Sequence, residues 1–234
     1  MTLQISPFTP ISILPRSPAR LPKVDRRCEI VVCVASAHGL TALVTILSSL
    51  DQSFPVALVL VPDRFTRFPD SLPFILEEYC PLRVKIAENE ERPIPGVIYL
   101  PPKNAKLTLS HERKLMVSPE GAAGTFEASD AIFSSAAESC NGRVVALLLG
   151  GIATGTTEGL KLLRAAGGLT LAVDDDPPDG FGCVNDCRAC LIDYLLPQDA
   201  IGPVLENLAR ERVARHPGGR KSAESVASIS TGQK

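Results

Sequence analysis

The stretch IVVCVASAHGLTALVTILSSL, residues 30–50, decides the fold class of this chain. Residues 30–34 form a continuous apolar run of mostly β-branched side chains, which is typical of a strand buried on both faces. Residues 39–50 have the apolar spacing of a helix, and residues 56–61 are a second run rich in valine and leucine. A strand, a helix and a second strand in this order predict a parallel crossover.

The second half of the chain repeats this alternation. Residues 144–149 and 169–173 predict strands, residues 157–166 predict the helix between them, and a further helix is expected to pass through Cys187. Strands that alternate with helices predict a mostly parallel sheet with helices on both faces. The predicted fold class is therefore α/β, as a single doubly wound domain.

The middle of the chain has shorter apolar runs. Residues 84–87, 96–100 and 106–109 could each form a strand, and several prolines lie around them. Short strands separated by Pro-rich turns favour hairpins. We therefore expect a hairpin-rich middle or an antiparallel edge in this region.

Both ends of the chain differ in composition from its centre. Residues 1–27 are rich in proline and arginine and have no periodic apolar pattern, so we expect a disordered arm and no further folded domain there. Residues 215–234 begin near a helix-stopping proline and two glycines and finish in small polar residues, which predicts a disordered tail. The folded domain is expected to span residues 28–214.

Composition and charge weigh against several classes of function. The 234 residues carry 24 Lys and Arg against 26 Asp and Glu, a formal net charge of −2, whereas nucleic-acid binding calls for a basic surface. No run approaches the roughly 18 apolar residues of a membrane span, and prolines interrupt the N-terminus before a signal-peptide core could form. The seven cysteines are expected to be reduced and buried. We predict a cytoplasmic protein with no membrane insertion and no nucleic-acid partner.

The first candidate for chemistry follows the first predicted strand. In a doubly wound sheet, ligands bind beyond the carboxyl ends of the strands. At this place the chain reads ASAHG, residues 35–39, so that the Ser36 hydroxyl stands between a strand and a helix N-terminus that would stabilise a developing oxyanion. Two interpretations stay open: Ser36 is a nucleophile, or Ser36 or a neighbour only caps the helix.

Several sequence blocks resemble one known family. In chain order they are VCVASAHG (32–39), AENE (87–90), PGVIYLPP (95–102), SDAIFSSAA (129–137), EGL (158–160), LRAAGG (163–168) and DYLLP (193–197). They are similar to motifs of the chemotaxis protein-glutamate methylesterase (CheB-type) family and cover about residues 28–208. The resemblance implies a single doubly wound α/β domain, in agreement with the strand and helix pattern.

The resemblance also implies a reaction, the hydrolysis of glutamate methyl esters on chemoreceptors by a Ser-His-Asp triad. Ser36 matches the nucleophile. The family's histidine, in VVQH, corresponds to Asp63 in LVPD, and the family's aspartate, in TGMGxDG, corresponds to Gly155. Serine needs a neighbouring base, and a carboxyl with an ordinary pKa of about 3.9 suits that role poorly. We therefore expect lost or much reduced esterase activity.

One other histidine, His38, is a candidate for the missing base. His38 stands where the family has a glycine, two residues after Ser36, but side chains at such spacing on a helix point apart. The two remaining hypotheses are a serine esterase with low activity or a changed substrate, and a pseudoenzyme that acts as a binding or scaffold module. The resemblance implies a partner for either: the cytoplasmic region of a methyl-accepting chemoreceptor or a related signalling protein.

A second candidate is the motif Cys183-x3-Cys187-x2-Cys190, which has the spacing of an iron–sulfur site. This spacing also places the three thiols on one face of a helix, as a core stripe would. No fourth ligand for zinc is evident nearby. We expect structural thiols, no metal and no cofactor.

Overall fold

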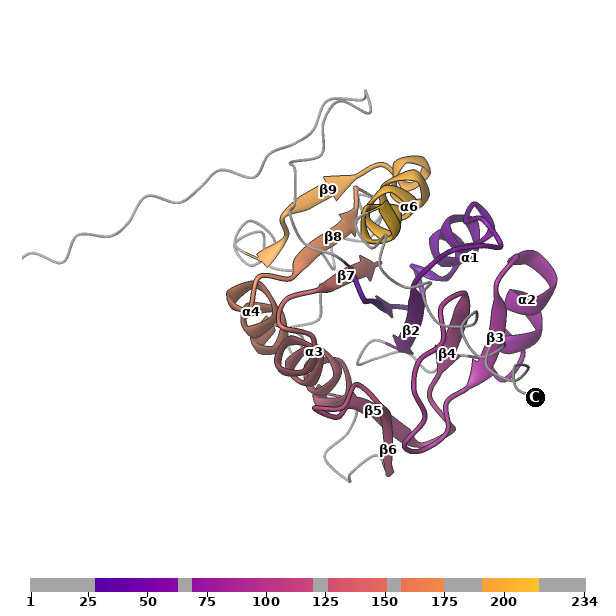
Figure 1. The fold of residues 1–234 in the computed structure, drawn as a ribbon. Coiled ribbons are helices and arrows are strands. Elements are labelled where there is room, and N and C mark those ends of the chain that lie inside the picture. Colours follow the sequence, from indigo (N-terminus) through magenta and orange to yellow (C-terminus); the bar gives the residue numbers. More distant parts are fainter. Residues whose placement is uncertain (1–27, 63–68, 120–125, 151–156, 175–190, 215–234) are drawn as a thin grey trace, which may run out of the picture.

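The computed structural model describes residues 28–62, 69–119, 126–150, 157–174 and 191–214. Among them is a seven-stranded sheet in the order β3-β4-β2-β1-β7-β8-β9, shown in Figure 1. All its described pairings are parallel. The strands are β1 (Ile30–Ala35), β2 (Ala57–Pro62), β3 (Arg83–Ile86), β4 (Val97–Leu100), β7 (Val144–Leu149), β8 (Leu169–Val173) and β9 (Tyr194–Leu196).

The two central strands explain why the predicted runs are continuously apolar. Every residue of β1 and β7 is buried. Alternate side chains of a strand point to opposite faces, so β1 contributes Val31 and Cys33 to one core and Val32 and Val34 to the other. The prediction of a doubly wound parallel sheet is confirmed.

Helices cover both faces of this sheet. On one face, α1 (Leu40–Ser48), α2 (Leu72–Tyr79) and α6 (Gln198–Ala214) contribute buried side chains to the first core. On the other face, α3 (Phe126–Cys140) and α4 (Thr157–Ala165) contribute to the second. Figure 1 shows α3 and α4 side by side on one side of the sheet, with α1 and α6 on the other.

The middle of the chain differs in part from the expectation. β5 (Ala105–Leu109) and β6 (Leu115–Pro119) form one antiparallel hairpin. The runs at 84–87 and 96–100 instead belong to β3 and β4, which pair in parallel with each other. The short connection at residues 87–96 favoured a hairpin, because parallel strands usually need a longer crossover. Here residues 87–96 connect two parallel strands without an intervening helix.

Four cysteines lie among the described residues, and all four are buried: Cys28, Cys33, Cys80 and Cys140. Burial raises the pKa of both the Cys80 and Cys140 thiols to about 11, and it also raises the pKa of Cys33. The expectation of buried thiols is confirmed for these four. No helix in the described part of the chain is long and apolar enough to cross a bilayer. The expected arm at 1–27 and tail at 215–234 lie outside the described residues.

Candidate functional site at the carboxyl edge of the sheet

Ser36 directly follows β1, at the edge where β1, β2 and β7 all end. In the sheet register, Ala35 pairs with Pro62 of β2 on one side and with Leu149 of β7 on the other. The Ser36 amide donates a hydrogen bond of 2.9 Å to the Leu149 carbonyl oxygen, which extends the ladder by one residue. Ser36 is thereby fixed at the centre of this edge, with only 8% of its surface exposed.

The hydroxyl of Ser36 has two described partners, both in the backbone. Its Oγ donates a hydrogen bond of 2.9 Å to the carbonyl oxygen of Gly150. The Gly39 amide donates a longer hydrogen bond, 3.4 Å, to the same Oγ. The hydroxyl proton therefore points to a carbonyl oxygen, which can accept a hydrogen bond but is too weakly basic to take the proton.

Two glycines allow the turns after β1 and β7 to approach so closely. Gly150 has a φ of +83°, and a Cβ at this position would overlap the Ser36 Oγ. A Cβ at Gly39 would overlap the carbonyl oxygen of Leu149. Side chains at either position would push the two turns apart, so the environment of Ser36 depends on both glycines.

Ser36 is not itself the N-cap residue of α1. Helix α1 begins at Leu40, its N-cap is Gly39, and this residue makes no side-chain capping hydrogen bond. Ser36 lies three residues before the N-cap. Its hydroxyl bonds both to the Gly150 carbonyl oxygen after β7 and, at the longer distance, to the amide of Gly39 at the start of α1.

Of the other predicted site residues, the structure describes His38 but not Asp63 or Gly155. His38 lies in the turn before α1, not on the helix as expected, and it is exposed whereas Ser36 is buried. Neither described hydrogen bond of the Ser36 hydroxyl involves His38. Asp63 and Gly155 lie outside the described residues, so their assignment to the family's histidine and aspartate positions stays a prediction.

Asp130 links α3 to α4 by a hydrogen bond, and the sequence analysis did not identify this role. Its Oδ1 accepts a hydrogen bond of 3.0 Å from the amide of Gly159, in the first turn of α4. A Cβ at Gly159 would lie 2.7 Å from the Asp130 carbonyl oxygen, so α3 and α4 are closely packed here. Burial raises the pKa of the Asp130 carboxyl, and the neighbouring Glu158 contributes to the rise. Its place in the block SDAIFSSAA was the only signal in the sequence.

The predicted thiol motif cannot be placed, because Cys183, Cys187 and Cys190 lie outside the described residues. Within the described ranges, no group of three His, Cys, Asp or Glu side chains is arranged to hold a metal ion.

A doubly wound α/β sheet with a serine at a sharp strand-to-helix turn is an arrangement shared with α/β serine hydrolases. The chain belongs to the CheB methylesterase family, whose model matches residues 31–205.

Two relatives show how much of the chain the similarity covers. A protein-glutamate methylesterase/protein-glutamine glutaminase of Rhizobium meliloti (strain 1021) is 34% identical over 185 residues, 78% of this chain and 52% of the relative. A protein of the same name from Nitrosospira multiformis is 30% identical over 197 residues, 82% of this chain and 56% of the relative. The chain thus spans about half the length of these curated relatives.

A solved structure agrees with the family assignment. The crystal structure of the Thermotoga maritima CheB methylesterase catalytic domain superposes with a TM-score of 0.65 at 26% identity. The match covers 77% of this chain and 98% of that domain. The predicted resemblance and fold are confirmed by these comparisons.

Proposed function

We propose that this chain is a methylesterase-fold module of chemosensory signalling that has lost most or all of the family's ester hydrolysis. In this proposal it acts by binding the cytoplasmic region of a chemoreceptor, or a related signalling protein, in the cytoplasm. The observation that carries the proposal is the hydrogen bond from the Ser36 Oγ to the Gly150 carbonyl oxygen.

The chemistry of serine explains why this bond matters. A serine hydroxyl becomes a nucleophile when a neighbouring base removes its proton as the new bond forms. The Gly150 carbonyl cannot do so, and the residues at the family's histidine and aspartate positions are Asp63 and Gly155. In serine hydrolases, loss of the histidine typically removes roughly a million-fold in turnover.

The substrate and partner classes rest on the relatives. The names of these relatives describe activity on protein glutamate and glutamine side chains. The chain matches about half of each relative, and the matched half corresponds to a solved catalytic domain. A domain that keeps this fold keeps the scaffold on which such a protein substrate would dock.

The experiment that tests the proposal is labelling with a fluorophosphonate probe, which reacts with activated serines. We expect no labelling of the wild-type chain, because neither described partner of the Ser36 hydroxyl is a base. The Ser36→Ala variant serves as the background control, and an active serine esterase labelled in parallel shows that the probe works. Rapid stoichiometric labelling that Ser36→Ala abolishes would overturn the proposal and favour an esterase with a changed substrate.

A further inference from the structure

A cavity lies at the opposite edge of the sheet from Ser36. It has a volume of about 230 Å³ and lies at the amino ends of the two central strands, beside Ile30 of β1 and Ala57 of β2. The segment that leads into β4 and the end of α3 complete its wall, through Pro93, Pro95 and Cys140. This edge is remote from the family's catalytic edge, so the cavity is separate from the site described above.

Two arginines near this cavity, Arg113 and Arg143, each contact the Glu29 carboxylate and a carbonyl oxygen at the carboxyl end of α3. Glu29 lies between them: its Oε2 is 2.9 Å from Nη1 of Arg113, and its Oε1 is 3.1 Å from Nη1 of Arg143. The Nε of Arg113 donates to the Ser139 carbonyl oxygen, and the Nε of Arg143 donates to that of Cys140. Each guanidinium is thus held between a carboxylate and the carboxyl end of α3, which fixes its orientation in advance.

Capping of α3 accounts for only part of this arrangement. Of the charged residues that line the cavity, Glu29 supplies one negative charge, and Arg92 and Arg113 supply two positive charges. Arg143, the second partner of Glu29, is not part of this lining. The nearby Glu112 pairs with Lys114 at 2.9 Å, and that hydrogen bond is the main cause of its lowered pKa, to which Arg92 also contributes. The lining itself therefore carries one positive charge in excess.

The rest of the lining is apolar. Ile30, Ala57, Leu109 and Cys140 are all buried, and burial raises the pKa of the Cys140 thiol to about 11, further above neutral pH. Arg113 is 45% exposed at its side chain, so part of its planar fork remains accessible. A ligand that fits such a lining has an anionic end for the guanidinium groups and a compact apolar body for the floor.

We propose that this cavity binds a small organic anion, a carboxylate or phosphate carried on a single ring or short hydrocarbon, with Arg92 and Arg113 holding the charged group. The volume suits a ligand of about the size of benzoate and lies below the roughly 300 to 1,000 Å³ of pockets for larger ligands. This inference does not depend on the proposed function, because the two sites lie at opposite edges of the sheet.

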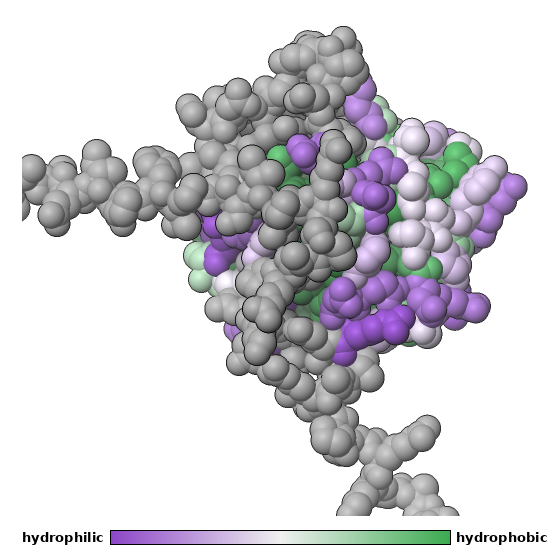
Figure 2. All heavy atoms as spheres, turned by 90° about the horizontal axis from the view of Figure 1, so that it is seen from above, coloured by the Kyte–Doolittle hydropathy of each residue, from purple (hydrophilic) through white to green (hydrophobic). Residues whose placement is uncertain are grey.

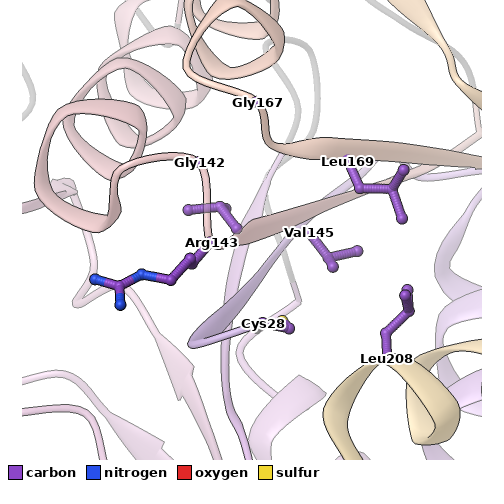
Figure 3. A pocket seen from close by; sticks show the side chains of 8 residues that line it. Cys28, Gly142, Arg143, Val145, Gly167, Leu169 and Leu208 are labelled. Atoms are coloured by element: carbon purple, nitrogen blue, oxygen red, sulfur yellow. The ribbon is translucent and has the colours of Figure 1, made fainter. Parts of the chain in front are cut away.

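Two other features of the surface offer less room or less apolar area. Figure 3 shows a neighbouring hollow between Cys28 and Leu208, from which the Arg143 side chain points away. Its volume is about 10 Å³, room for about one water molecule. In Figure 2 the hydrophobic residues left uncovered lie in separate small areas among hydrophilic ones.

The test is a calorimetric titration of the full chain with benzoate and with phenyl phosphate. Neutral benzamide, which has the same ring but no charge, is the matched control ligand. We expect saturable one-to-one binding of at least one anion and no binding of benzamide. Arg92→Gln and Arg113→Gln should each weaken the binding about tenfold, the scale of one charge-assisted hydrogen bond. Arg92 is exposed, so its substitution is not expected to disturb folding, and a melting curve checks this for both variants.

The control variant is Lys103→Gln, which removes the same charge from an exposed side chain paired only weakly with Asp70 at 3.3 Å. It should bind the anions like the wild type. Three results would each overturn the proposal: no saturable binding of either anion up to about 10 mM, which is weaker than a typical specific site; equal binding of benzamide; or equal weakening by Lys103→Gln and Arg92→Gln.

Discussion

The Ser36 hydroxyl donates a 2.9 Å hydrogen bond to the carbonyl oxygen of Gly150, which joins the turn after β1 to the turn after β7. In a serine hydrolase this proton faces a histidine. Here the described acceptor of the Ser36 hydroxyl proton is a backbone carbonyl oxygen, and the hydrogen bond links two strand ends. The proposed loss of esterase activity rests on this relationship.

Gly150→Ala should disturb that link. The φ of +83° is unfavourable for alanine, and the new Cβ would overlap the Ser36 Oγ. We expect a loss of about 1 to 3 kcal/mol in the free energy of unfolding, measured by urea denaturation. Ser48→Ala, at an exposed position of α1, is the control. A Gly150→Ala variant within about 0.5 kcal/mol of wild type would show that the contact is not needed.

Asp130 should make stability depend on pH in a predictable direction. Its pKa is raised in the folded chain, mainly by burial, so the folded state binds more protons than the unfolded state as the carboxyl titrates. Stability should therefore decrease as pH rises from the ordinary aspartate pKa through the folded pKa, and level off above it. Asp130→Asn keeps an oxygen for the Gly159 amide and removes the titration, so its unfolding free energy should lack this component.

The measurement for Asp130 is urea unfolding of both proteins between about pH 4 and pH 7, the range above the ordinary aspartate pKa of about 3.9. Asp70→Asn is the control, since the Asp70 side chain is 86% exposed. If wild type and Asp130→Asn change in parallel over this range, the carboxyl is not perturbed and the prediction fails.

Much of the fold could be predicted from the sequence because its central strands are buried on both faces. The apolar run at 144–149 has the same bounds as β7, and that at 169–173 the same as β8. The parallel pairing of β3 with β4 could not be predicted, since the chain returns between them without a helix and the pairing is set by the tertiary structure.

The site was predictable to a smaller extent. The motif around Ser36 located the serine, but its partner Gly150 is far away in the chain and is brought close only by the pairing of β1 with β7. The cluster of Glu29, Arg113 and Arg143 left no local signal either, because each residue is an ordinary charged side chain in its own segment. Asp130 was visible only as part of a motif.

Limited proteolysis should trim the chain to a stable core of about residues 28–214. The flanking segments are rich in proline at one end and in glycine and serine at the other, and neither has an apolar pattern that could pack. Mass spectrometry of the resistant fragment gives its bounds. Protection of the first 20 residues against several proteases would show instead that the N-terminal segment docks on the domain.

The double variant Asp63→His with Gly155→Asp should gain ester hydrolysis over the wild type. It restores the two residue types that the family carries at these positions, and triad members act as a unit, so each single variant should gain little. Hydrolysis of p-nitrophenyl acetate reports the gain. The triple variant that also carries Ser36→Ala is the control. If the double variant stays at the background of that control, the positions assigned at 63 and 155 are wrong.

The most direct measurement is the turnover of the wild-type chain on methylated chemoreceptor, followed as methanol release, beside Ser36→Ala. We expect the two proteins to release methanol at the same rate, indistinguishable from receptor alone, because neither described partner of the Ser36 hydroxyl is a base. A wild-type turnover of about 1 s⁻¹ or faster, within the ordinary range of enzymes and abolished by Ser36→Ala, would contradict the account and point to an unrecognised base.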